Sequence, residues 1–150
     1  MARARKSARG KRRRRPPPAK PTDAERRLLA LARELGGRDG DPWPGTLRAL
    51  AAAYAPDAPL PRAVGRAWLA SRRDKTAALA LAWAREQVRL ALQEIIEATP
   101  PAERRPLAMA PELLAWLLLA GCEALAQEPP SAVADRVRAL AALTGRDGGP

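Results

Sequence analysis

Prolines divide this chain into Ala- and Leu-rich segments, and that division restricts the folds open to it. The sequence has 16 Pro in 150 residues, no Phe, and long stretches of Ala and Leu between the prolines. Val and Ile are few, so the composition favours helices over strands. We therefore expect an all-α protein built around one modest core.

Local signals predict where these helices begin and end. Thr22 and Glu25 form a capping-box pattern for the first helix, which Gly36 and Gly37 should end. Thr46 and Ser71 are expected to cap later helices, because hydroxyl side chains accept hydrogen bonds from the first backbone amides. Pro61 and Pro111 are expected to open others. The predicted helices cover 23–35, 47–54, a stretch from 61, a long stretch ending at 98, 111–127 and 131–143.

Apolar patterns predict how the helices pack. Val64, Ala67 and Trp68 are expected to point inward from the third helix. The fourth helix carries more apolar residues than one stripe can hold, so we expect it to be covered on two sides. One set is Leu79, Trp83, Leu90 and Ile95, and the other is Leu81, Val88, Leu92 and Ile96. The fifth is apolar nearly all round, so we expect a homodimer formed through residues 111–143.

Positive charge is concentrated in two places. Residues 1–20 hold ten Lys or Arg and no acid, which supplies +10 of the net charge of +11. This stretch has little to bury and repels itself, so residues 1–21 are predicted to be a disordered arm. The second place is 62–75, with a local excess of +4. In the arm, the residues expected to contact phosphates are Arg12, Arg13, Arg14 and Arg15.

The basic stretch 62–75 follows a short helix through a turn, which is the order of a helix-turn-helix. Arg62 and Arg66 are then expected to face bases or phosphates, while cations at the next helix start hold the backbone. The alternative is an ordinary solvated face in an Arg-rich chain. The full set expected to contact nucleic acid outside the arm is Arg48, Arg62, Arg66, Arg72, Arg73 and Lys75.

Residues for common catalytic chemistry are scarce. The chain has no His, one Cys, one Tyr and three Ser. Without His, a Ser-His or Cys-His nucleophile cannot be assembled, and histidine is also missing as a metal ligand. We expect no enzyme activity, no cofactor and no metal site.

Cys122 is the lone cysteine and lies in an apolar run, so it is expected to fill the core. A single cysteine forms no disulfide within the chain, which favours a reducing, cytoplasmic location. The longest strongly apolar run, 113–122, is shorter than the about 20 residues that span a membrane, so no membrane contact is expected.

Several positions resemble the DNA-binding unit of TetR-like transcriptional regulators. Leu28, Leu29, Ala32 and Leu35 resemble the core pattern of the family's first helix, and Gly40 stands where a glycine usually ends that element. Residues 46–51, Thr-Leu-Arg-Ala-Leu-Ala, are similar to the pattern (Ser/Thr)-Val-Arg-x-Ile-Ala. The family's closing motif is Tyr-x-x-Phe-x-x-Lys; Leu69 and Lys75 are spaced like its first and last residues, and Arg72 occupies the place of its Phe.

The resemblance implies a homodimer that binds a palindromic DNA operator and responds to a small-molecule effector in an apolar pocket near Trp83 and Trp116. The predicted units are an arm (1–21), a helix-turn-helix-like unit (22–75), a helical dimerisation and ligand domain (76–145) and a frayed tail (146–150). The alternative function is a non-catalytic helical interaction module, associated with the nucleoid or the ribosome, whose basic tail alone contacts nucleic acid.

Overall fold

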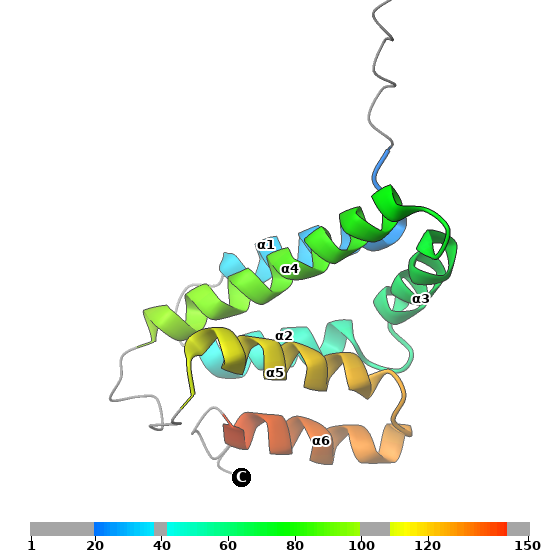
Figure 1. Ribbon diagram of the computed structural model, residues 1–150. Helices are drawn as coiled ribbons and strands as arrows, with labels where there is room; N and C mark the ends of the chain where they lie inside the picture. Colours follow the sequence, from blue (N-terminus) through cyan, green and yellow to red (C-terminus); the bar gives the residue numbers. More distant parts are fainter. Residues whose placement is uncertain (1–19, 38–41, 100–108, 144–150) are drawn as a thin grey trace, which may run out of the picture.

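The computed structural model describes residues 20–37, 42–99 and 109–143, with the side chains of 42–44 left out, and these residues form helices and turns without a strand (Figure 1). The all-α prediction is therefore confirmed. Arg12 to Arg15 and the tail 146–150 lie outside the described residues. The helices are α1 (Asp23–Gly36), α2 (Pro42–Ala53), α3 (Pro59–Ser71), α4 (Lys75–Ala98), α5 (Pro111–Leu125) and α6 (Pro130–Leu143).

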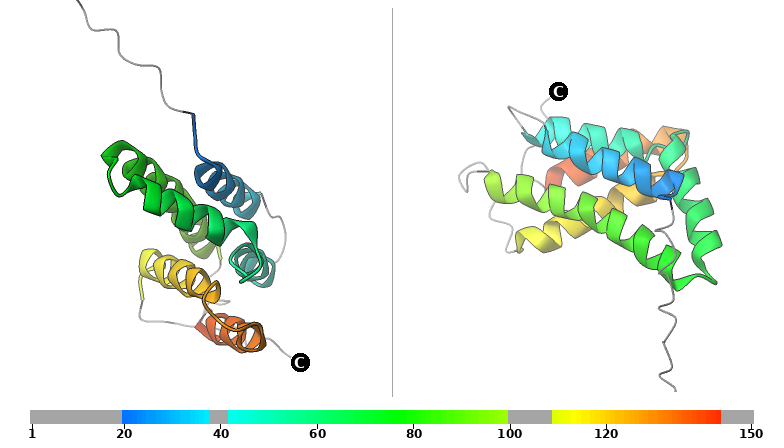
Figure 2. Two further views of the ribbon diagram at one scale, coloured as in Figure 1. Left: turned by 90° about the vertical axis from the view of Figure 1, so that its right-hand side faces the viewer. Right: turned by 90° about the horizontal axis from the view of Figure 1, so that it is seen from above.

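Four helices enclose the centre of the molecule. α1 and α5 each pack against both α4 and α2, so these four form a closed bundle. α6 packs on the outer side of the bundle, against α2 and α5. α3 crosses one end, where it contacts α4 and α1 more than α2 (Figures 1 and 2).

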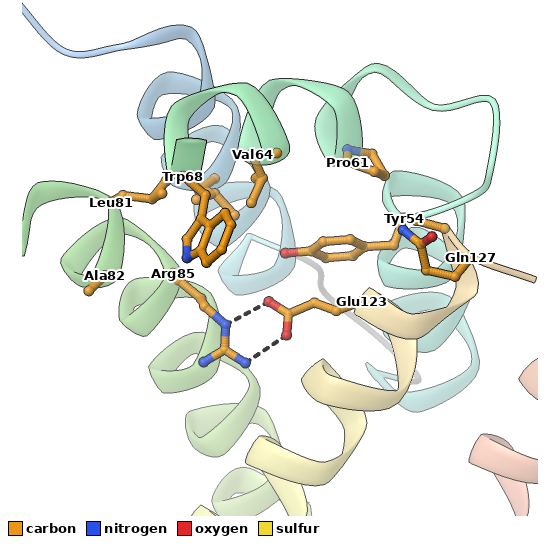
Figure 3. A pocket seen from close by; sticks show the side chains of 12 residues that line it. Tyr54, Pro61, Val64, Trp68, Leu81, Ala82, Arg85, Glu123 and Gln127 are labelled. Atoms are coloured by element: carbon orange, nitrogen blue, oxygen red, sulfur yellow. Dashed lines mark hydrogen bonds and ion pairs between the residues drawn. The ribbon is translucent and has the colours of Figure 1, made fainter. Parts of the chain in front are cut away.

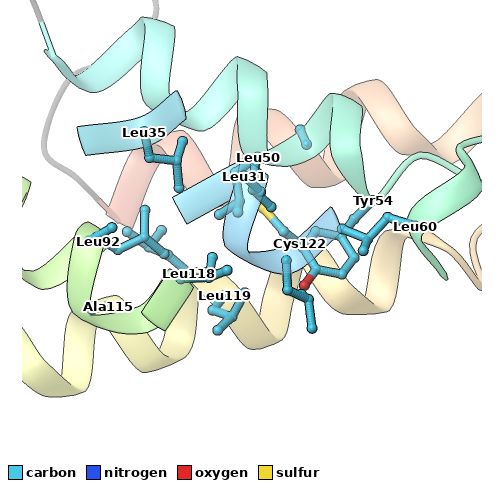
Figure 4. Close-up of a cluster of buried hydrophobic side chains, with 14 of the residues drawn as sticks. Leu31, Leu35, Leu50, Tyr54, Leu60, Leu92, Ala115, Leu118, Leu119 and Cys122 are labelled. Carbon is cyan, nitrogen blue, oxygen red and sulfur yellow. The ribbon is translucent and has the colours of Figure 1, made fainter. Parts of the chain in front are cut away.

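One leucine-rich core runs through α1 to α5. Leu28, Leu50, Leu92 and Leu118 are at most 1% exposed, and Figure 4 shows several members of this cluster converging from different helices. The boundary predicted between residues 75 and 76 falls at the start of α4, and the core continues across it. α6 has no fully buried side chain, so it is the most peripheral of the described helices.

The start and end predicted for α1 are confirmed. The Thr22 hydroxyl oxygen accepts a hydrogen bond from the Glu25 backbone N–H at 3.2 Å and donates one to the Glu25 carboxylate at 2.8 Å. At the other end, the Gly37 N–H donates to the Arg33 carbonyl at 3.0 Å. The Glu25 and Gly37 amide hydrogen bonds satisfy backbone groups at the two helix ends, and the bond between the Thr22 and Glu25 side chains holds the cap in place.

Prolines start α2 and α3 earlier than predicted. α2 begins at Pro42 rather than after Thr46, and α3 begins at Pro59 rather than Pro61. A proline suits the first helical turn because its φ is already helical and that turn needs no N–H donor. Thr46 consequently lies inside α2, fully buried, and its hydroxyl has no hydrogen-bond partner within the described part of the chain.

Asp74, not Ser71, caps α4. Its carboxylate accepts hydrogen bonds from the N–H groups of Thr76 at 2.9 Å and Ala77 at 3.1 Å. Ser71 ends α3 instead, where its hydroxyl donates to the Trp68 carbonyl at 2.9 Å. An acid at this position also interacts favourably with the helix dipole, which explains why the start falls three residues later than predicted.

Some side chains predicted to be buried are exposed. Within one chain, the prediction that α4 is covered on two sides is wrong, because Leu79 is 71% exposed and Trp83 57% exposed. Trp68 on α3 is 58% exposed, so its predicted burial in the core is also wrong. On α5 the large exposed apolar side chains are Leu113 and Trp116.

Candidate functional site

The outer side of α3 carries the basic residues singled out in the sequence. Arg62 and Arg66 are exposed and lie one helical turn apart, so they share a side of the helix. Arg73 and Lys75 are exposed at the corner between α3 and α4. Arg72 lies over the indole ring of Trp68, with its guanidinium carbon 5.6 Å from the ring centre.

Arginines on several other helices are neutralised by acids of their own helix. Arg27 pairs with Asp23 at 2.9 Å on α1, and Arg138 pairs with Asp135 at 2.9 Å on α6. On α4, Arg89 pairs with Glu86 in the same way. By contrast, no ion pair with another described residue involves the cations at α3 and its corner: Arg62, Arg66, Arg72, Arg73 and Lys75.

The described chain begins beside this basic surface. Lys20 is exposed, and the start of α1 lies at the end of the bundle that α3 crosses (Figures 1 and 2). Arg48 is exposed on α2, a helix that packs against α1, α5 and α6. The structure therefore brings the chain start and the α3 cations to one end, whereas Arg48 belongs to another helix.

A cavity of about 490 Å³ lies beneath α3, between α4 and the ends of α2 and α5 (Figure 3). Neither Trp83 nor Trp116 lines it, and both are exposed, so this cavity is not the pocket that the resemblance implies. Its lining residues are Leu28, Tyr54, Pro61, Val64, Gly65, Trp68, Leu81, Ala82, Arg85, Glu123, Ala126 and Gln127.

A bidentate ion pair between Arg85 and Glu123 forms one wall of the cavity. Nε of Arg85 donates to one Glu123 carboxylate oxygen at 2.6 Å, and Nη2 donates to the other at 2.7 Å. These hydrogen bonds raise the pKa of Arg85, against the opposing effect of its partial burial. The pair joins α4 to α5 and leaves the wall without net charge.

The Tyr54 hydroxyl is the unusual polar group of the cavity. Tyr54 is 3% exposed, and its hydroxyl has no hydrogen-bond partner in the part of the chain that the structure describes. Burial, followed by the negative charge of Glu123, raises the pKa of Tyr54 well above its ordinary value. The phenol is therefore protonated at neutral pH and available as a donor.

The cavity was not predicted from the sequence. Arg85 and Glu123 are 38 positions apart, so no local pattern connects them. The one available signal was that Tyr54 is the only tyrosine of the chain, placed just before a proline that ends a helix.

No outside similarity adds to these geometric observations. Comparisons with protein-family models, curated proteins and solved structures find no match to this chain. Within the described ranges, no group of three acidic or Cys residues comes together that could hold a metal ion. None of the helices in 20–37, 42–99 and 109–143 combines the length and apolar character needed to cross a membrane.

Proposed function

We propose that this protein binds duplex DNA through the outer side of α3, as a dimeric transcriptional regulator of TetR-like type. The observation that carries the proposal is the group of exposed cations, without acidic partners among the described residues, on α3, which crosses one end of the bundle, and at the corner between α3 and α4. A helix presented in this way fits the major groove, which admits an α-helix. The TetR-like part of the proposal rests on the sequence resemblance alone.

The proposed contacts divide by their position. Arg62 and Arg66, on the helix itself, reach base edges or the phosphates that border the groove. Arg73 and Lys75, at the corner, bind the phosphate backbone. Asp74 already occupies the first amides of α4, so these contacts are made by side chains and not by the helix terminus. The basic residues of 1–20 add affinity that is independent of sequence.

Duplex binding measured at several salt concentrations tests the proposal. The full chain, a chain lacking residues 2–20, and the double variant Arg62→Ala/Arg66→Ala are compared. The double variant is expected to bind more weakly and to reduce the slope of log K against log salt by about 2, since each lost phosphate contact removes about 0.9. Arg138→Ala is the matched control, because that arginine is 72% exposed on α6 and paired with Asp135.

A second candidate is the helical interaction module whose basic tail alone contacts nucleic acid. The observation that favours it is the exposure of five large apolar side chains on α4 and α5: Leu79, Trp83, Leu90, Leu113 and Trp116. Exposed apolar surface often marks protein contacts. Complete loss of DNA binding on deleting 2–20, with no effect of the Arg62→Ala/Arg66→Ala change, supports this candidate and contradicts the first.

The proposed dimer interface consists of α5, which lies within the predicted dimerisation segment 111–143, and of the exposed face of α4. Trp116 is 47% exposed and Leu113 48% exposed, although both are large apolar residues. Sedimentation of the wild type at increasing concentration is expected to show a dimer, and Trp116→Glu is expected to shift it to a monomer. A monomer at all concentrations would contradict the dimer.

A further inference from the structure

The cavity beneath α3 has the size and walls of a small-molecule site. Its volume of about 490 Å³ falls within the range of about 300–1,000 Å³ that ligand pockets occupy. Leu28, Val64 and Leu81 supply aliphatic walls, and the indole of Trp68 hangs over the opening from α3 (Figure 3). These surfaces suit an apolar, and in particular an aromatic, ligand body.

One buried polar group points into this apolar space. Figure 3 shows the Tyr54 ring entering from the end of α2 with its hydroxyl directed toward the cavity. Buried polar groups almost always have a hydrogen-bond partner, and this hydroxyl has none among the described residues. A ligand acceptor within the cavity would satisfy it, because the neutral phenol donates.

The paired charges of Arg85 and Glu123 in the cavity wall favour an uncharged ligand. Arg85 and Glu123 neutralise each other through two short hydrogen bonds, so an anion would have to compete with Glu123 and a cation with Arg85. An uncharged ligand leaves the pair intact.

We infer that this cavity binds an uncharged, mostly aromatic small molecule whose carbonyl oxygen accepts a hydrogen bond from the Tyr54 hydroxyl. The inference does not depend on the proposed DNA contact. Arg62 and Arg66 are not part of the lining, and the ligand measurement uses no nucleic acid.

Two dyes test the inference on the full chain. Prodan is an uncharged naphthalene with one ketone, and dimethylaminonaphthalene is a related dye that lacks the ketone. Wild-type protein is expected to bind both saturably, with a blue shift of the prodan emission. Tyr54→Phe keeps the ring but removes the donor, so prodan should bind about 3- to 10-fold more weakly while the other dye changes less than about 2-fold.

Two further variants make the test specific to this cavity. Gly65 lies on the lining, and a Cβ at this position meets no atom within 4 Å, so Gly65→Leu can fold while its side chain occupies the space. It is expected to weaken both dyes. Leu79→Ala, which removes an exposed apolar side chain outside the lining, is the control and should leave both affinities unchanged.

The inference is overturned by any of four results. The first three are no saturable prodan binding up to its solubility limit, equal prodan affinity in wild type and Tyr54→Phe, and loss of binding in Leu79→Ala with retention in Gly65→Leu. An equal weakening of both dyes by Tyr54→Phe also overturns it, because the ring and not the hydrogen bond would then matter. Circular dichroism of each variant checks that the helices are retained.

Discussion

The ion pair between Arg85 and Glu123 should be a measurable link between α4 and α5. Its two hydrogen bonds, at 2.6 and 2.7 Å, join residues that are 38 positions apart in sequence. Replacing Glu123→Gln keeps the shape of the side chain but removes its charge, and Arg85→Met keeps much of the apolar stem. Combining both changes gives a double-mutant cycle that isolates the pair.

The expected magnitude lies between two reference cases. Hydrogen bonds to charged groups contribute about 1.5–3 kcal/mol, whereas fully exposed ion pairs contribute about 0–1 kcal/mol. The side chains of Arg85 and Glu123 are 35% and 29% exposed, so solvent screens the pair in part. We expect a coupling free energy of about 1–1.5 kcal/mol.

Urea unfolding followed by circular dichroism measures this coupling. Each single variant is expected to lower the free energy of unfolding by about 1–2 kcal/mol, which moves the midpoint by about 0.5–1 M urea. The double variant should cost less than the sum of the two single variants, because the second change removes a charge already left without its partner. Additive single effects, with a coupling near zero, would refute the reasoning.

Three further predictions concern other parts of the fold. A Cβ on Gly121 would overlap the terminal methyl groups of Leu140, so Gly121→Val should push that side chain aside and loosen the packing of α6 on α5, with faster hydrogen exchange in α6 than in wild type; unchanged exchange in α6 would contradict this. Burial raises the pKa of Cys122 to about 12, so its thiol should be inert to a disulfide reagent in the native state and react on unfolding; rapid native reaction would contradict its burial. Hydrogen bonding to Arg89 lowers the pKa of Glu86 below its ordinary value of 4.5. The pair therefore stabilises the fold fully above pH 4.5, and this stabilisation is lost as the pH falls through the lowered pKa of Glu86 in the folded protein. The difference in melting temperature between wild type and Glu86→Gln should therefore shrink between about pH 6 and about pH 3, and a constant difference would contradict this.

Local sequence was sufficient for the class of fold and for most helix positions. The Thr22 cap of α1 was predicted correctly and the end of α1 to within one residue, because the groups that satisfy these helix ends are close in sequence. Errors arose where two start signals compete within a few residues. Pro59 and Pro61 both fit the first turn of α3, and the helix begins at the earlier one. Asp74, and not Ser71, caps α4, because its carboxylate accepts hydrogen bonds from the first backbone amides.

Burial was harder to predict, because it depends on which helix face meets a neighbour. Trp83 and Leu81 are both apolar residues of α4, yet Trp83 is 57% exposed and Leu81 8% exposed. This difference in exposure follows from where α1, α3 and α5 lie around α4. When two apolar sets share one helix, hydrophobic periodicity alone does not specify which set the neighbouring helices cover.

Composition and spacing alone determined that this chain forms helices, that its charge gathers in an N-terminal stretch and at 62–75, and that it lacks imidazole chemistry. Those properties depend on residue identity and on contacts within one helical turn. Tertiary packing decided that the cations of α3 face outward without acidic partners, and that Tyr54, Arg85 and Glu123 meet around one cavity. Contacts between residues tens of positions apart exist only after the helices pack, because packing is what places their surfaces together.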